Sequence, residues 1–368
     1  MKQNAKKVFS VIVLSVYFAL CYFMLDYMTE YPFWILISMF ASVLFMFTTH
    51  ELGHLIFGYL TGYQFISYRI FSLTLVKENG KFRFCRMNVP GTGGQCLMAP
   101  PEKKNGKYPF VLYNLGGILF CGILSLIPIS LSLLFLDRQP IGMCLFIFGF
   151  VSFVMNLLNA IPTDGKGMVN DATNLRMALG NPRAQNALWN QLQYCALHAR
   201  NIRTADMPEE IFFIPEKKDL GNVLLIWQAL AYIEREEDRG NYEKAREYVH
   251  FVLDHAPFIW PVYDGILRSE AVFLNSLLGC DPTHTDAFYE KIKKIPFLQK
   301  TASFQRARYA YFSLFKKDSV QAAQARDSLE KIWKKIPFPS ELHFEQDQIR
   351  QIENILSADS ENGNTSTS

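Results

Sequence analysis

Long apolar runs fill the first 161 residues of the 368-residue chain, whereas the remainder alternates apolar and polar positions as soluble helices do. Four of these runs hold the roughly 18 residues that a helix needs to cross a hydrocarbon core of about 30 Å. They cover residues 8–25, 33–60, 110–136 and 141–161. The pattern predicts a mainly α chain, with a four-span membrane domain in residues 1–180 and a soluble helical domain after it.

The first apolar run follows the basic segment MKQNAKK, an arrangement that it shares with signal peptides. No small-residue cleavage site follows, and DYMTEYPF leads directly into the next run, so we expect a retained first helix. Lysine and arginine are concentrated before the first span and in the connection 61–108. The positive-inside rule therefore predicts a multi-pass protein of the cell membrane, with both termini and the long connection in the cytosol.

The connection between the second and third spans contains two alternating stretches, in ISYRIFSLTLVKENGKFRFCRMNVP, on either side of Asn79-Gly80. This pattern predicts a cytosolic β-hairpin. Its free edge could accept an extended substrate, although a hairpin that only shields a site fits equally well. The following GTGGQCLMAPP lacks the spacing of a phosphate-binding loop, and we interpret it as a closely packed backbone turn.

Amphipathic helices are predicted from residue 181 to residue 356, followed by a polar tail, 357–368, that we expect to be disordered. Before Pro257, apolar residues recur at helical spacing: Tyr242, Ala245, Val249 and Val252. This segment resembles a tetratricopeptide repeat, and related segments end at Pro296 and Pro337. Such an array would offer a concave surface to a protein or peptide partner, whereas an ordinary helical bundle remains the alternative.

Three ionisable side chains interrupt the second apolar run, within HELGH. His50 and His54 are four residues apart, so a helix places them on one face with about 5–6 Å between their Cβ atoms. Two neutral imidazoles at this spacing can bind one zinc ion, with Glu51 beside it to accept a proton from water. An acidic side chain at the middle of a spanning helix costs about 2.5–3.5 kcal/mol on insertion scales. We therefore favour a functional site over a metal-free cluster of hydrogen bonds between helices.

A catalytic zinc site needs a third protein ligand, and the segment after the fourth span offers two aspartates. Pro162 should end the fourth span, since proline lacks the N–H that continues a helix. Asp164, before a glycine, also suits a turn, and Asp171 also suits a helix cap. Asp171 opens the periodic segment DATNLRMAL, which favours it as the ligand, while Asp164 stays open.

Together these motifs resemble those of the site-2 protease family, which are intramembrane zinc metalloproteases. The resemblance comprises HExxH in one apolar span, Gly116-Gly117 in the next, and Asn159-x-x-Pro162 followed by an aspartate. It implies that one zinc ion per chain is bound by two histidines and an aspartate and that the glutamate activates water. The glycine pair would allow close helix packing beside the site. Asn159 and Pro162 would support the site or the substrate.

The resemblance is not complete around the aspartate. The usual family pattern, Asn-x-x-Pro-x-Pro-x-Leu-Asp-Gly, would align Asp164 as the ligand, but Asn159 and Ile161 stand where its prolines belong. A longer branch of the family carries an Asn-Asp pair about eight residues after the Asn-x-x-Pro motif. That alignment assigns Asp171, although Ala172 replaces the usual glycine.

The net charge and the cysteine pattern argue against several other classes of protein. A formal net charge of +3 gives no reason to expect a nucleic-acid partner. The seven cysteines form no CxxC pair, which argues against a zinc ribbon or a disulfide framework. We therefore expect a zinc endopeptidase in the lipid bilayer that hydrolyses a peptide bond in or near the transmembrane segment of a single-span protein or peptide. The alternative is a non-catalytic membrane scaffold that recruits partners through its helical domain.

Overall fold

The computed structural model describes residue 15 and residues 30–78, 81–87, 92–135, 137–138, 140–163, 169–336 and 338–365. Three predicted features lie outside the described residues: the first span except residue 15, the turn at Asn79-Gly80, and Asp164. The described part is mainly helical with one small antiparallel sheet, which confirms the predicted fold class at that level. It forms two compact units, Met1–Gly53 with Gly117–Asn159 and His54–Gly116 with Ala160–Ser368.

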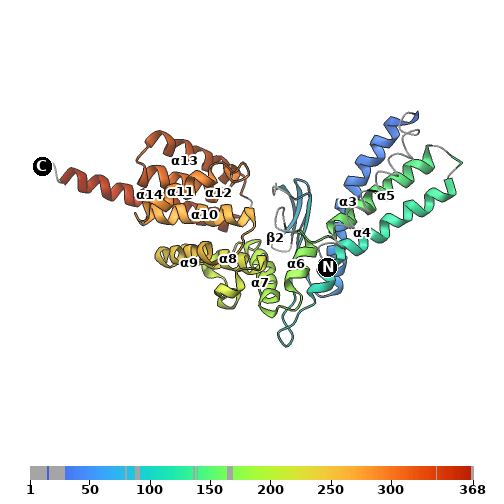
Figure 1. Cartoon of the computed structure of the whole chain (residues 1–368), viewed down its shortest axis with the longest axis horizontal. Coiled ribbons are helices and arrows are strands. Elements are labelled where there is room, and N and C mark those ends of the chain that lie inside the picture. Colours follow the sequence, from blue (N-terminus) through green and yellow to red (C-terminus); the bar gives the residue numbers. More distant parts are fainter. Residues whose placement is uncertain are drawn as a thin grey trace. The chain divides into compact units, whose positions relative to one another are not determined.

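Three long helices carry most of the apolar runs (Figure 1): α3 (Pro32–Leu60), α4 (Phe110–Ser132) and α5 (Ile141–Asn159). A short 3₁₀ turn, Leu133–Phe135, extends α4. Within the described residues, these three helices are long and apolar enough to cross a membrane. They coincide closely with the second, third and fourth predicted spans.

Large apolar side chains of these helices are exposed. Phe33, Leu36 and Phe40 of α3 expose 67%, 66% and 69% of their surface, and Ile123 of α4 exposes 62%. In water, such a continuous apolar surface would favour aggregation, whereas in a bilayer it contacts lipid at no cost. The distribution of exposed side chains therefore suits association with a membrane.

Small and polar residues lie where the helices touch. The Ser42 hydroxyl of α3 donates to the carbonyl of Phe148 on α5 at 3.1 Å, and the Ser152 hydroxyl donates to the carbonyl of Ser42 at 3.3 Å. A Cβ atom at Gly149 would lie only 2.7 Å from the carbonyl oxygen of Ser125, so this glycine lets α5 approach α4 closely. Small residues and hydrogen bonds between helices are typical of packing in membranes.

The connection between α3 and α4 folds as a four-stranded sheet of order β3-β2-β1-β4, with all neighbours antiparallel. The strands are β1 (Gln64–Ile70), β2 (Leu73–Glu78), β3 (Lys81–Arg86) and β4 (Gly94–Ala99). β2 pairs with β3 so that Leu73 lies opposite Arg86 and Glu78 opposite Lys81, which confirms the predicted hairpin. The sheet is larger than predicted, because β1 and β4 extend the hairpin.

The interpretation of GTGGQCLMAPP as a turn was wrong, since most of it forms β4. Cys96 and Met98, two residues apart, are both buried, so the segment has the period of two that a strand requires, which its glycines obscure. A Cβ atom at Gly58 would lie 2.3 Å from the sulfur of Met98. This glycine therefore allows the end of α3 to pack directly on β4.

The remaining described chain is mainly helical, and most of these helices pack on the next helix in sequence (Figure 1). They are α6 (Asp171–Ala178), α7 (Pro182–His198), α8 (Val223–Asp238), α9 (Tyr242–His255), α10 (Pro261–Leu277), α11 (Pro282–Ile292), α12 (Ala302–Ala310), α13 (Ser319–Trp333) and α14 (Pro339–Thr365). Ala245, Val249 and Val252 of α9 are fully buried, as the helical spacing predicts. The repeat itself stays a prediction, and α14 continues past residue 357, where we placed the start of the tail.

Candidate metal centre

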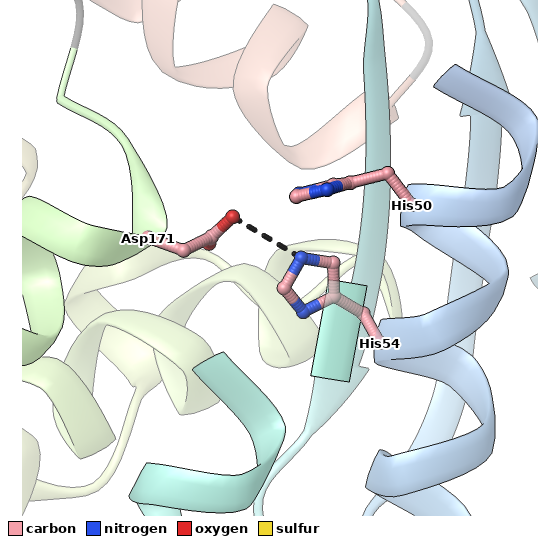
Figure 2. Close-up of side chains that lie close together, drawn as sticks. All are labelled: His50, His54 and Asp171. Atoms are coloured by element: carbon pink, nitrogen blue, oxygen red, sulfur yellow. Dashed lines mark hydrogen bonds and ion pairs between the residues drawn. The ribbon is translucent and has the colours of Figure 1, made fainter. Parts of the chain in front are cut away.

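The two histidines and the glutamate of HELGH lie on α3, an uninterrupted helix over this segment. All three are buried, with 3% of His50, 9% of Glu51 and 4% of His54 exposed. Figure 2 shows that the imidazoles of His50 and His54 project from α3 toward Asp171, the first residue of α6. Because the two residues are four apart on one helix, both side chains leave the same face of α3.

Asp171 completes a cluster with the spacing of metal ligands. One potential ligand atom from each of His50, His54 and Asp171 lies within 4.8 Å of the other two. The Nε2 atom of His54 and the Oδ2 atom of Asp171 are 3.1 Å apart. Zinc binds nitrogen and oxygen at about 2.0–2.2 Å, so two ligands of a tetrahedral ion lie roughly 3.4 Å apart. The His54–Asp171 separation is therefore close to that of a bound pair.

The orientation of His54 is set by a backbone acceptor. Its Nδ1 atom lies 2.7 Å from the carbonyl oxygen of Tyr113, at the start of α4. A carbonyl only accepts, so Nδ1–H donates this bond and the neutral ring carries its lone pair on Nε2. Tyr113 is itself held, because its ring stacks on Tyr63 at 4.4 Å and its hydroxyl donates to the carbonyl of Cys96 at 2.8 Å. The sheet thus supports the carbonyl that orients His54.

A side-chain amide has the same role for His50. Its Nδ1 atom lies 3.2 Å from Oδ1 of Asn156, which is buried on α5. Asn156 Nδ2 donates to the carbonyl of Ile118 at 2.9 Å, and this fixes Oδ1 as the amide atom that faces His50. Nδ1–H of His50 is therefore the donor, and its Nε2 is left as the ligand atom.

The tautomers that these hydrogen bonds fix can be compared with those that a metal ion requires. With its proton on Nδ1, His54 turns an unprotonated Nε2 toward a carboxylate oxygen 3.1 Å away. Two acceptors at this distance repel each other unless a cation lies between them. A proton can satisfy one such pair, whereas a divalent metal ion satisfies both imidazoles and the carboxylate together. The donor set of two histidines and one carboxylate is one that catalytic zinc uses.

The start of α6 places Asp171 in the cluster. The N-cap of this helix is Asn170, whose Oδ1 accepts from the backbone N–H of Thr173 at 2.9 Å. Asn170 Nδ2 donates to the carbonyl of Ile161 at 2.9 Å, so it also ties the segment after α5 to α6. The capping role that we considered for Asp171 therefore belongs to Asn170.

The other predicted site residues lie near the ends of the same elements. Asn159 is the last residue of α5, and Pro162 follows outside any helix, as expected of a residue that cannot continue one. Gly116 and Gly117 are buried in α4, one turn after Tyr113. Asp164 lies outside the described residues, so its candidacy as a ligand stays a prediction.

Sequence reasoning missed the two groups that orient the imidazoles. Asn156 carried a signal, since it is a polar residue late in the apolar run FIFGFVSFVMNLLN, but we assigned it no role from the sequence. The Tyr113 carbonyl carried none, because a backbone acceptor is present at every residue. Comparisons of the chain with protein-family models, with curated proteins and with solved structures found no match.

Proposed function

We propose that this chain is a membrane-embedded zinc metalloendopeptidase of the site-2 protease type. The observation that carries the proposal is the geometry of HELGH: both histidines have Nδ1 held by an acceptor, and Asp171 lies against Nε2 of His54. A cluster that served only to connect helices would have no need to direct lone pairs at a carboxylate.

The proposed roles follow from position. His50, His54 and Asp171 would hold the ion, while Asn156 and the Tyr113 carbonyl keep the two imidazoles in the ligating tautomer. When bound, zinc would supply Lewis acidity, which polarises a peptide carbonyl and makes water more acidic. Glu51 is the general base: its carboxylate takes a proton from water and then delivers it to the leaving amine.

The surroundings support a membrane substrate. His50 lies about 6 Å beyond the middle of α3 at a rise of 1.5 Å per residue, well within a helix of membrane-spanning length. A peptide bond at that depth normally belongs to a helix whose hydrogen bonds protect it. We therefore propose that the substrate is a single-span protein or membrane peptide that unwinds locally before cleavage, and that the soluble half of the chain is cytosolic.

The test combines metal content with cleavage. Detergent-purified protein is incubated with a pooled library of single-span segments, the products are identified by mass spectrometry, and zinc is measured per chain. The wild type should hold zinc and cleave, while Glu51→Gln should keep the zinc and lose cleavage, because the amide cannot take the proton. The control Glu247→Gln, on the exposed side of α9, should behave as the wild type. Equal fragments from wild type and Glu51→Gln would refute the mechanism.

A further inference from the structure

A cavity of about 630 Å³ lies within the unit that contains the sheet and the helical half. Helices α7, α8, α10, α12, α13 and α14 line it, and Ser67, Gln95 and Leu97 of the sheet contribute to its wall. Its volume is within the range of ligand-binding sites. We call it the acidic cavity, after the five glutamates in its lining: Glu234, Glu237, Glu270, Glu341 and Glu345.

The lining holds fewer positively charged side chains than carboxyl groups. In the part of the lining that the structure describes, Lys300 and Arg306 are the only lysine or arginine side chains. Buried Arg306 lies 2.5 Å from Glu270, 3.4 Å from Glu345 and 3.5 Å from Glu237, so a single guanidinium serves three buried carboxyl groups. Among the described residues, Oε1 of Glu237 and Oε2 of Glu345 are buried without a hydrogen-bond partner. Such atoms cost free energy unless a donor reaches them.

Protonation of the carboxyl groups offsets part of this cost when no donor is bound. Burial raises the pKa of Glu345 to about 7, and burial likewise raises the pKa values of Glu237 and Glu270. A guest with its own positive charge and N–H donors would take the place of these protons and supply the missing hydrogen bonds. The carboxyl groups thus favour a cationic ligand over a neutral or anionic one.

Much of the rest of the wall is apolar. It includes Trp227, Tyr263, Ile266, Ile332 and Phe338. Aromatic faces attract cations, and aliphatic walls suit the methylene stems of lysine and arginine. A ligand with an apolar stem and a cationic head would therefore use both parts of the lining, which a small inorganic cation would not.

We propose that the acidic cavity binds a lysine- or arginine-bearing peptide segment, the cytosolic flank of the membrane-anchored substrate. The identity of this peptide rests on the proposed function. Single-span proteins carry an excess of lysine and arginine on their cytosolic side, which provides the charge that the cavity lacks. The sheet that forms one wall begins directly after α3, the helix of the metal cluster. The cavity would retain a substrate by its flank while the neighbouring span reaches the site.

The experiment measures binding of a fluorescein-labelled peptide of about twelve residues, alternating arginine and leucine, to the full-length protein in detergent by fluorescence anisotropy. Glu341→Gln removes one ionisable carboxyl group from the cavity wall, and binding is measured at pH 8, above the value of about 7 to which burial raises the pKa of Glu341. It should weaken binding roughly tenfold, since a charge-assisted hydrogen bond is lost. The matched control Glu247→Gln removes an exposed charge outside the cavity and should bind as the wild type. Circular dichroism verifies that each variant is folded.

The inference is overturned if a peptide with glutamate in place of arginine binds as tightly as the arginine peptide, or if spermine at the same charge concentration competes as well as that peptide does. It is also overturned if Glu341→Gln and Glu247→Gln weaken binding equally. A second substitution, Glu234→Gln on α8, must also weaken binding, which guards against an effect particular to α14. Zinc content and cleavage separate the two proposals. A wild type that cleaves but ignores the peptide refutes this inference alone, whereas one that binds the peptide without zinc or cleavage refutes the proposed function.

Discussion

Replacement of Asn156 by leucine tests how the metal cluster is organised. The side chain accepts from Nδ1–H of His50 at 3.2 Å and donates to the carbonyl of Ile118 at 2.9 Å. Leucine has a similar volume and neither polar atom, so the imidazole of His50 loses the partner that fixes its tautomer and its rotation. Loss of such an outer partner typically weakens metal binding 10- to 100-fold, or by about 1.4–2.7 kcal/mol.

The effect on folding should be smaller than the effect on zinc affinity. Hydrogen bonds between helices in membranes contribute on average about 0.6 kcal/mol, so the two lost bonds together cost roughly 1 kcal/mol of unfolding free energy. Zinc affinity is measured by competition with a fluorescent chelator in detergent, and stability by thermal unfolding of the same samples. Asn156→Leu should therefore change the zinc affinity more than it changes the stability.

Two further variants make this prediction specific. Asn156→Asp keeps an oxygen acceptor for His50 and should retain zinc within a few-fold of the wild type. Ser152→Ala, one turn earlier on α5, removes a hydrogen bond to the carbonyl of Ser42 without touching His50, and it should leave zinc affinity unchanged. If Asn156→Leu binds zinc as tightly as Ser152→Ala does, Asn156 does not orient a metal ligand.

Two other predictions concern packing and pH. Gly149→Ala should lower the unfolding free energy by about 1–3 kcal/mol in thermal melts, because its Cβ would meet the Ser125 carbonyl at 2.7 Å. Gly122→Ala should not, since the nearest atom to its Cβ is at 3.5 Å; equal melting temperatures would refute the close approach of α4 and α5. Affinity for the cationic peptide should rise about tenfold from pH 6 to pH 8 in anisotropy titrations, because a cation binds the ionised form of Glu345, whose pKa is about 7. Burial also raises the pKa of Glu341, in the same lining, to about 7, so Glu345→Gln should make this profile shallower and the double variant with Glu341→Gln should flatten it. A profile that Glu345→Gln leaves unchanged would exclude the Glu345 carboxyl group. Without peptide, stability should fall as pH rises from about 4.5 through 7, because the folded state holds the Glu345 proton more tightly than the unfolded state does. The same lining holds these other charged or titratable groups: Tyr194, Cys195 and His198 on α7, Glu234 and Glu237 on α8, Tyr263 and Glu270 on α10, Lys300, Arg306 on α12 and Glu341 on α14.

Much of the helical framework could be predicted from local pattern. The runs at 33–60, 110–136 and 141–161 correspond to α3, α4 and α5 within a few residues, because length and apolar content are properties of a continuous segment. The spacing of His50 and His54 implies a shared helix face for the same reason.

Features that depend on distant contacts could not be predicted. The segment of β4 reads as a glycine turn until pairing with β1 shows its register, with Tyr68 opposite Cys96. Asn156 becomes a partner of His50 only when α5 packs on α3. Each glutamate of the acidic cavity lies on an amphipathic helix and resembles a solvated charge in sequence. Only the packing of α8, α10 and α14 brings them to one cavity.

The central claim is that His50, His54 and Asp171 hold one zinc ion, and metal content tests it most directly. Zinc per chain is measured by mass spectrometry in detergent-purified wild type and in His54→Ala, Asp171→Ala and Asp164→Ala, each shown to be folded. We predict close to one zinc ion in the wild type and in Asp164→Ala, and loss of zinc from the other two variants. A folded wild type that binds no zinc, or an Asp171→Ala variant that keeps it while Asp164→Ala loses it, would contradict the account.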